Sequence, residues 1–210
     1  MSADAASEAD PGPCPDCGLG YVRGHAQNER FHPKLHNKTV NGHPTSLADG
    51  FYAVTHESPM EIQKLAEAAA ITARWETKYD FPSFAACIKN VDEYKTIIAM
   101  ICIRDRRVCG LLVSRERECN YTASLNSFRP HIFPSWRPTE IAEIRPHVRR
   151  AVEMIWVLKK NRRQGVAKES IQALAAHCGM NIGELAHMLP FSEDAVRLWT
   201  ALKLSLVYIV

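Results

Sequence analysis

The sequence predicts a mixed α/β protein, in which helices flank a twisted sheet and a small separate unit precedes it. Three observations predict this class: paired cysteines and histidines near the start, an early pattern of two apolar strands joined by a polar turn, and a later strand–helix–strand pattern. The composition, 46% hydrophobic and 23% charged over 210 residues, fits one globular domain with an appendage. It excludes a disordered or fibrous chain.

The cysteine and histidine pairs have the spacing of zinc ligands. Cys14 and Cys17 are followed, after a 14-residue spacer, by His32 and His36. Residues at i and i+4 share one face of a helix, so we expect a helix to present both histidines. Four ligands complete the coordination of zinc and leave no open position, so the predicted site is structural. Fingers that read DNA act in arrays of about 3 bp each, so a single finger need not contact bases.

The middle of the chain predicts a strand, a helix and a hairpin. Aromatic and branched residues indicate a strand at 49–56, and a helix is expected at 57–79. Two strands at 94–103 and 107–118 are separated by a short polar turn, which predicts a hairpin. The apolar positions that mark the buried face of the helix are Ile62, Leu65, Ala66, Ala69 and Ala73.

The secondary-structure signals in residues 119–210 are weak at first and then become clear. Several prolines and little periodicity at 119–148 predict an insertion or a long substrate loop. A strand is expected at 149–160, followed by a basic turn that becomes a helix within 161–179. After these, the expected elements are a short strand at 183–189, a helix at 192–203 and a final strand at 204–210.

The basic turn that opens the predicted helix within 161–179 is a candidate phosphate site. The first backbone N–H groups of a helix are unpaired and carry partial positive charge. Gly165 would let phosphate oxygens approach the backbone, and basic residues surround it: Lys159, Lys160, Arg162, Arg163 and Lys168. These residues by themselves are equally compatible with a solvated basic turn.

A family resemblance adds to this interpretation. The pattern R-x-x-G-x-A, at Arg162, Gly165 and Ala167, resembles the pyrophosphate-binding turn of the GNAT acetyltransferases. Seven segments resemble, in the same order, the zinc-finger acetyltransferases of the sister-chromatid cohesion family: "CPDCGLGY", "HPKLHN", "DGFYAVTHESP", "RVCGLLVSRE", "IWVLKKNRRQGVA", "LPFSED" and "LVYIV". The acidic N-terminal residues, which have no apolar core, predict a disordered lead-in at 1–12. The resemblance implies a C2H2-type zinc finger at 13–46 and a GNAT-like domain at 47–210.

The resemblance also implies an activity and a cosubstrate. It implies an N-acetyltransferase that moves acetyl from acetyl-CoA to an amine, with a lysine of a protein substrate as the first choice, and a structural zinc ion. The residues expected to bind coenzyme A are Ile155, Val157, Leu158, Arg162, Arg163, Gln164, Gly165, Val166, Ala167 and Lys168.

The expected catalytic residues lie near the C-terminus. Glu193 matches an aspartate proposed as the base in the family, and an apolar helix face after it predicts partial burial and a raised pKa. The alternative is a carboxylate that merely starts a helix. Trp199 stands where many GNATs have a tyrosine acid, so Tyr208 or Ser205 is expected to protonate the leaving thiolate. Lys159 replaces a family serine, which leaves a hydroxyl-assisted step open.

Two other functions stay open at this stage. One is an acetyltransferase for small-molecule amines, and the other is a nucleic-acid- or protein-binding module whose GNAT-like half is inactive. The net charge of +3 allows a nucleic-acid partner without requiring one. The scattered cysteines outside the finger, the absence of a signal peptide and the absence of a membrane span predict a cytoplasmic protein, nuclear in a eukaryote, with no membrane partner. The sequence does not specify the acceptor or the oligomeric state.

Overall fold

The computed structural model describes residues 12–18, 20–21, 26–77, 95–130, 135–189, 191–204 and 206–210. The expected lead-in therefore lies outside the described residues except at Gly12, which begins a strand. Within the described part of the chain, no helix is both long and apolar enough to cross a membrane.

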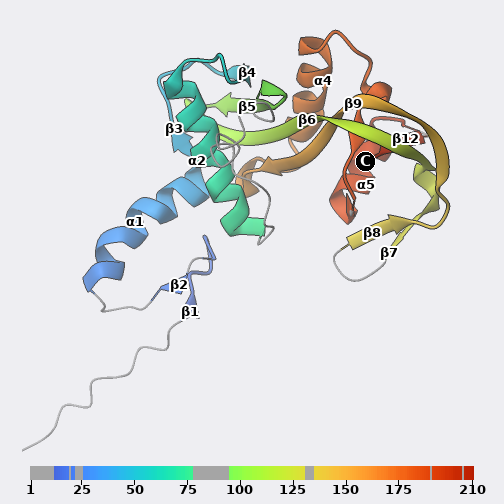
Figure 1. Ribbon diagram of the computed structural model, residues 1–210. Helices are drawn as coiled ribbons and strands as arrows, with labels where there is room; N and C mark the ends of the chain where they lie inside the picture. The colour runs from blue at the N-terminus through green and yellow to red at the C-terminus, as the bar shows by residue number, and fades with distance from the viewer. Residues whose placement is uncertain are drawn as a thin grey trace, which may run out of the picture.

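The N-terminal unit consists of a small hairpin and one helix. Strands β1 (Gly12–Pro13) and β2 (Gly20–Tyr21) pair antiparallel, and α1 (Ala26–Asn41) follows. Gly42 ends α1 with a φ of 81°, and β3 (His43–Pro44) then pairs with the main sheet. Figure 1 shows this unit on the left, with α1 beside α2.

The main sheet has seven strands, which follow the order β4–β5–β6–β9–β10–β12 with β3 beside β6. Their bounds are β4 (Gly50–Val54), β5 (Ile98–Arg104), β6 (Arg107–Ser124), β9 (Ala142–Val157), β10 (Ala186–His187) and β12 (Leu206–Ile209). The only parallel pairings within the described sheet are those of β10 with β9 and with β12. Because β12 also pairs with the end of β6, the strands β6, β9, β10 and β12 form a closed ring of pairings.

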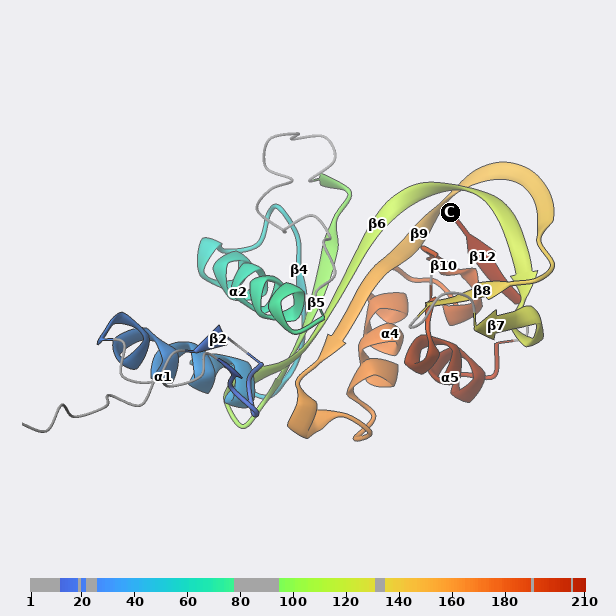
Figure 2. The ribbon, with the colours of Figure 1, turned by 90° about the horizontal axis from the view of Figure 1, so that it is seen from below.

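Helices cover both faces of the sheet. Helix α2 (Met60–Thr77) packs on one face, while α4 (Val166–His177) and α5 (Glu193–Ala201) pack on the other, as Figure 2 shows. The predicted stripe of α2 is at the interface, with Ala66, Ala69 and Ala73 fully buried. Two apolar cores therefore enclose the sheet, and the expected mixed α/β class is confirmed.

Most predicted elements form within a few residues of their expected bounds. The hairpin of β5 and β6 closes through Asp105 and Arg106, both with positive φ angles (52° and 54°). That conformation suits a two-residue hairpin turn, whose twist matches that of the strands. Helix α4 ends before Gly179, which adopts a φ of 63°, as expected of a helix-terminating glycine.

The prediction of a long loop at 119–148 is wrong. β6 continues to Ser124, a 3₁₀ turn (Leu125–Ser127) leads into β7 (Phe128–Pro130), and β8 (Ser135–Pro138) precedes β9. β7, β8 and β11 (Phe191–Ser192) form a second sheet.

The prolines in this segment do not interrupt the strands. Pro130 and Pro138 are the last residues of β7 and β8. Pro146 lies in β9 between His147, which pairs with Cys119, and Glu143, which pairs with Tyr121. Three residues of β9 there oppose one of β6, so Pro146 occupies a bulge, where a missing N–H is tolerated.

Gly42 and Gly179 offer a matched test of the packing between α1 and the sheet. Both have left-handed backbones after a helix, which costs an L-residue about 1–2 kcal/mol. A Cβ on Gly42 would also lie 2.2 Å from the Val108 carbonyl oxygen, whereas nothing lies within 4 Å of one on Gly179. We expect Gly42→Ala to lower the free energy of unfolding by about 1–3 kcal/mol more than Gly179→Ala, measured by urea titration. Equal losses would contradict the close approach at Gly42.

Candidate functional site

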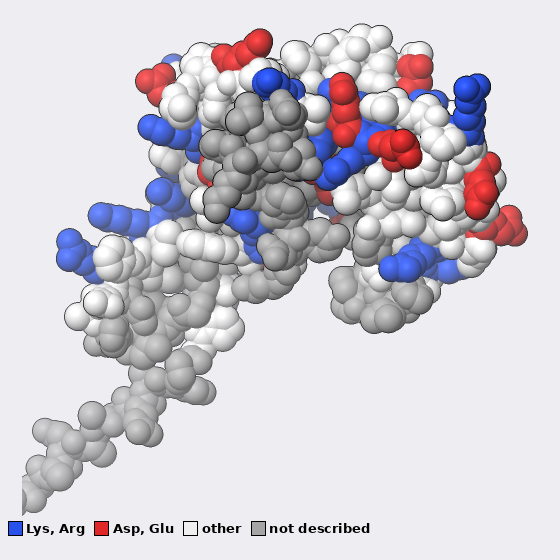
Figure 3. Space-filling view, viewed as in Figure 1, with Lys and Arg blue, Asp and Glu red and all other residues white. Residues whose placement is uncertain are grey.

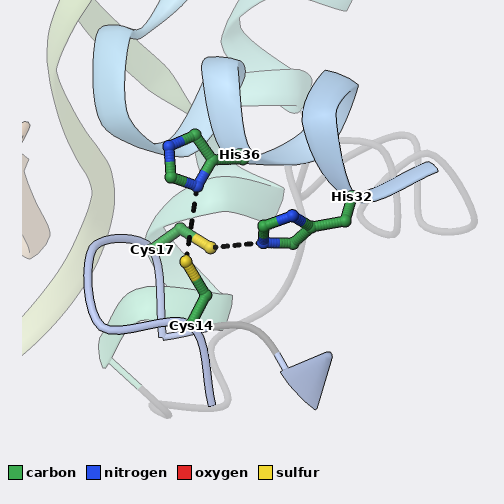
Figure 4. A group of neighbouring side chains, drawn as sticks. All are labelled: Cys14, Cys17, His32 and His36. Carbon is green, nitrogen blue, oxygen red and sulfur yellow. Dashed lines mark hydrogen bonds between the residues drawn. The ribbon is translucent and has the colours of Figure 1, made fainter. Parts of the chain in front are cut away.

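The four predicted metal ligands lie together. Each residue offers one ligand atom, and the four atoms all lie within 4.8 Å of one another (Figure 4). The residues are Cys14, Cys17, His32 and His36. The Cys14 sulfur is 3.4 Å from His36 Nδ1, and the Cys17 sulfur is 3.5 Å from His32 Nε2. With a Zn–S bond of about 2.3 Å and a Zn–N bond of about 2.1 Å, the sulfur–nitrogen edge of a tetrahedron is about 3.5 Å. The residues therefore fit a structural zinc ion.

The backbone around the cysteines favours the ligand form of sulfur. The pKa of Cys14 is lowered to about 6, chiefly because the Cys17 backbone N–H bonds to its sulfur. The carbonyl of Cys14 accepts the Gly18 N–H at 2.8 Å, which closes the tight turn that contains the two cysteines. A thiolate is the form that binds metal, so this turn prepares the site for a cation.

A buried histidine joins the N-terminal unit to the main domain. His43 on β3 lies 2.8 Å from the Thr72 hydroxyl on α2, through Nε2. Burial lowers the pKa of His43 to about 4, so it is neutral at physiological pH. His43 is thus part of the core between α1 and the sheet, and it is not among the clustered ligands.

The candidate phosphate turn has the predicted backbone. After a 3₁₀ turn (Lys159–Asn161), residues 162–165 form an exposed turn, and α4 begins at Val166. Gly165 has a φ of 84° at the N-cap position. The first turn of α4 lies close to β6, because a Cβ on Gly110 would be 2.7 Å from the Val166 side chain. The N-terminus of α4 is therefore held at the end of the sheet with its turn open to solvent.

The basic residues of this turn differ in what they contact. Arg162 donates from Nε to the Val157 carbonyl at 2.9 Å and forms an ion pair with Glu76. The Glu76 side chain is only 7% exposed and also accepts the Trp156 indole N–H at 2.7 Å. Arg162 is thereby tied to the fold. Arg163 makes an exposed ion pair with Asp194 at 3.1 Å, a type worth about 0–1 kcal/mol and easily exchanged.

The other expected coenzyme A residues divide between the surface and the core. Gln164 and Lys168 are exposed, and Ala167 is half-buried. Val166 and Leu158 are buried, and Leu158 donates its N–H to Cys109 of β6 at 2.9 Å. Leu158 thus supports β9 from the core side and does not line an open surface.

Strands β9 and β10 part before β9 reaches this turn. They pair only through Ala151–Ala186 and Val152–His187. Successive residues of a strand direct their backbone N–H and C=O groups to opposite edges of the strand. Because the Leu158 N–H bonds Cys109 of β6, the backbone groups of Val157 and Ile155 point away from β6. In the described part of the chain, no strand pairs with this edge of β9 beyond Val152. A free strand edge thus runs toward the turn at 162–165.

The expected burial of Glu193 is wrong. Its side chain is 51% exposed and pairs with Arg197 one turn along α5. The Ser192 hydroxyl accepts the Ala195 N–H at 3.1 Å and caps α5, and Glu193 and Asp194 follow in the first turn. Helix α5 buries its opposite side, including Trp199, so its first-turn carboxylates face solvent.

The other expected catalytic positions are Tyr208 and Ser205. Tyr208 on β12 pairs with Ala186 of β10, and the Arg149 guanidinium lies 3.5 Å from the centre of its ring. Ser205 lies outside the described residues. Tyr208 is therefore on the strand next to β10, and the Arg149 guanidinium covers its ring.

Sequence reasoning missed two polar groups near the place where β9 and β10 part. Glu153 occupies a bulge in β9, is 9% exposed, and forms ion pairs with Arg115 at 3.3 Å and Arg117 at 3.2 Å. His187, at the last β10 rung, is fully buried against Trp199, and burial lowers its pKa to about 3. The signal that could have revealed the Glu153 group is the presence of charged residues inside predicted strands, as in "RERE" at 115–118.

One cavity in the described part of the chain borders Arg149, whose guanidinium lies over the Tyr208 ring. Its volume is about 580 Å³, and it lies at the C-terminal end of α4, beside His177, Cys178 and Glu184. The candidate phosphate turn is at the other end of the same helix.

The fold is that of a known acetyltransferase domain. The structure of the xEco2 acetyltransferase domain bound to a coenzyme A conjugate matches with a TM-score of 0.59 and 18% identity, over 79% of this chain and 94% of that chain. A second structure of that domain matches with a TM-score of 0.56 and 18% identity, over 79% and 93%. No protein-family model and no curated protein sequence matches the chain. The resemblance inferred from the segments is confirmed at the level of fold.

We expect Cys17→Ala to lose the bound zinc ion and the folded N-terminal unit, since structural zinc sites contribute about 10–16 kcal/mol to the folding of small units. Metal analysis of the purified variant measures this. Cys178→Ala removes another cysteine far along the chain, at the end of α4, and should retain one zinc ion per chain. Full zinc content in Cys17→Ala would contradict the ligand assignment.

Proposed function

We propose that this chain, which has the fold of the xEco2 acetyltransferase domain, is an acetyl-CoA-dependent N-acetyltransferase whose acceptor is a lysine of a protein. The observation that carries the proposal is the free edge of β9, which leads from the parting of β9 and β10 to an exposed glycine turn at the start of α4. In this proposal the zinc finger spans 13–46 and the acetyltransferase domain spans 47–210.

The free edge and the turn suit different parts of coenzyme A. The N–H and carbonyl groups of Ile155 and the N–H of Val157 can bond the amides of the pantetheine arm as a neighbouring strand would, while the Val157 carbonyl accepts Arg162. The N–H groups at the start of α4, from Gly165 onward, are suited to the pyrophosphate. Arg163 and Lys168 add positive charge from the surface.

Arg162 takes a different role from the one that its motif suggests. Because it bonds Glu76 and the Val157 carbonyl, it holds the turn against α2 and the end of β9. We therefore assign it to positioning of the turn, with Gln164, Val166 and Ala167 completing the backbone that faces the phosphates.

Acetyl transfer requires a neutral amine, and a free lysine has a pKa of about 10.4. In the proposed reaction Glu193 accepts the proton of the ammonium, directly or through water, and the amine nitrogen attacks the thioester carbonyl. The C–N bond forms, the C–S bond breaks, and Tyr208, Ser205 or water protonates the thiolate. Backbone N–H groups of 154–158 that face the free edge can stabilise the oxyanion.

The exposure of Glu193 is compatible with this role only if the acceptor approaches from solvent. A protein lysine does so, because its long side chain extends from a surface. Labelled acetyl-CoA should therefore be consumed with lysine-bearing proteins in preference to small amines. Transfer to small amines alone would replace the acceptor class, and no transfer to either would remove the proposed activity.

Gly165→Glu should abolish coenzyme A binding, measured by calorimetry, because it adds a side chain and a negative charge at the proposed pyrophosphate position. The matched control is Gly179→Glu, at the other end of α4, where the φ is also positive and nothing lies within 4 Å of a Cβ. The control should bind coenzyme A normally. Unchanged affinity in Gly165→Glu would mean that the turn is a solvated basic loop.

Glu193→Gln should lower kcat about 10²–10⁴-fold and leave coenzyme A affinity unchanged, because it keeps the shape and removes the base. Two controls separate the base from its surroundings. Arg197→Gln removes the same ion pair but keeps the carboxylate, and Asp194→Asn removes the adjacent charge. Both should retain most activity in steady-state assays. A dead Asp194→Asn with an active Glu193→Gln would assign the base to the neighbouring residue instead.

A further inference from the structure

The solvent face of α1 carries a row of positive charge. Arg30, Lys34 and Lys38 are exposed and stand four residues apart, so they lie on consecutive turns, about 6 Å apart along the helix. We call these three residues the α1 basic row. Figure 3 shows basic side chains along the outer, left-hand edge of the molecule over α1.

The α1 basic row has no part in the folding of the N-terminal unit. Lys34 is two positions along the helix from each of the ligands His32 and His36, so the row and the ligands lie on roughly opposite sides of the helix. In the described part of the chain, none of the three forms an ion pair, although the Arg30 guanidinium lies over the Phe31 ring. Like charges at i and i+4 oppose helix formation. The fold therefore tolerates the row without using it.

We propose that the α1 basic row binds the phosphate backbone of duplex DNA without reading its bases. A duplex carries a rigid, dense series of phosphates, and a rigid helix with a cation on each successive turn is complementary to it. Contacts of arginine and lysine with phosphate position a protein on DNA independently of sequence. Asn37 is exposed between Lys34 and Lys38 and offers an amide donor, which phosphates also accept.

An acidic protein segment is a less suitable partner. Protein interfaces are usually anchored by aromatic side chains buried near their centre. As described, Phe31 is the one large apolar side chain exposed on α1, and it stands beside Arg30 at one end of the row. The row itself offers charge at regular spacing and no apolar centre. This DNA contact goes beyond acetyl transfer and does not depend on it.

The test uses the full zinc-loaded chain and a labelled duplex of arbitrary sequence, with binding followed by fluorescence anisotropy between about 50 and 200 mM salt. Each phosphate contact contributes about 0.9 to the slope of log K against log salt concentration. The variant Arg30→Ala/Lys34→Ala/Lys38→Ala should therefore reduce this slope by about 2.7. Its zinc content should stay at one ion per chain, which shows that the finger is folded.

The control carries the same change in charge at exposed residues on other elements, Lys64→Ala/Arg137→Ala/Arg145→Ala. It should keep most of the parent's slope and affinity. The proposal is overturned if the α1 variant keeps the parent's slope, or if the control loses as much, since the effect would then be one of overall charge. It is also overturned if the parent binds polyglutamate through the row but not the duplex, because the partner would then be an acidic protein.

Discussion

The long antiparallel pairing of β6 with β9 is the constraint on which the rest of the structure depends. It runs from Gly110–Val157 to Thr122–Ala142. The extra residue at Glu153 inverts the alternation of side chains along β9, so Met154 packs in the core under α2 whereas Val152 packs in the core under α4 and α5. The bulge therefore lies where the side chains of β9 change the core that they face, next to the last rung between β9 and β10. The free edge proposed to hold pantetheine is a consequence of this geometry.

The buried carboxylate of Glu76 connects three elements of the main domain. It accepts the Trp156 indole N–H from β9 and pairs with Arg162 of the turn, while its own backbone belongs to α2. Because the Glu76 carboxylate is buried, its ion pair with Arg162 and its hydrogen bond from Trp156 hold the turn in place before any phosphate arrives. Such preorganisation reduces the ordering cost of binding. Arg162 thus has a structural reason to be present that its motif position does not reveal.

The finger is stabilised differently from the domain beside it. The described hairpin of β1 and β2 pairs only two residues on each side, and α1 places its buried face against α2 and β3. A zinc ion held by the ligand set would supply folding energy that this hairpin lacks, and His43 fixes the junction through Thr72. Because zinc and this junction use one side of α1, the other side is left for the basic row. A single finger can therefore act as a structural unit and as a docking surface.

The sequence by itself determined the features that depend on near neighbours. Ligand spacing placed Cys14, Cys17, His32 and His36 together, and local turn and helix signals located the β5–β6 hairpin and Gly165 at the start of α4. Tertiary structure alone decided the rest. The strands within 119–148, the partner that Arg162 finds 86 residues away, the parting of β9 from β10 and the exposure of Glu193 all depend on which distant segments meet. No local pattern encodes these meetings, because burial and pairing are properties of the packed sheet.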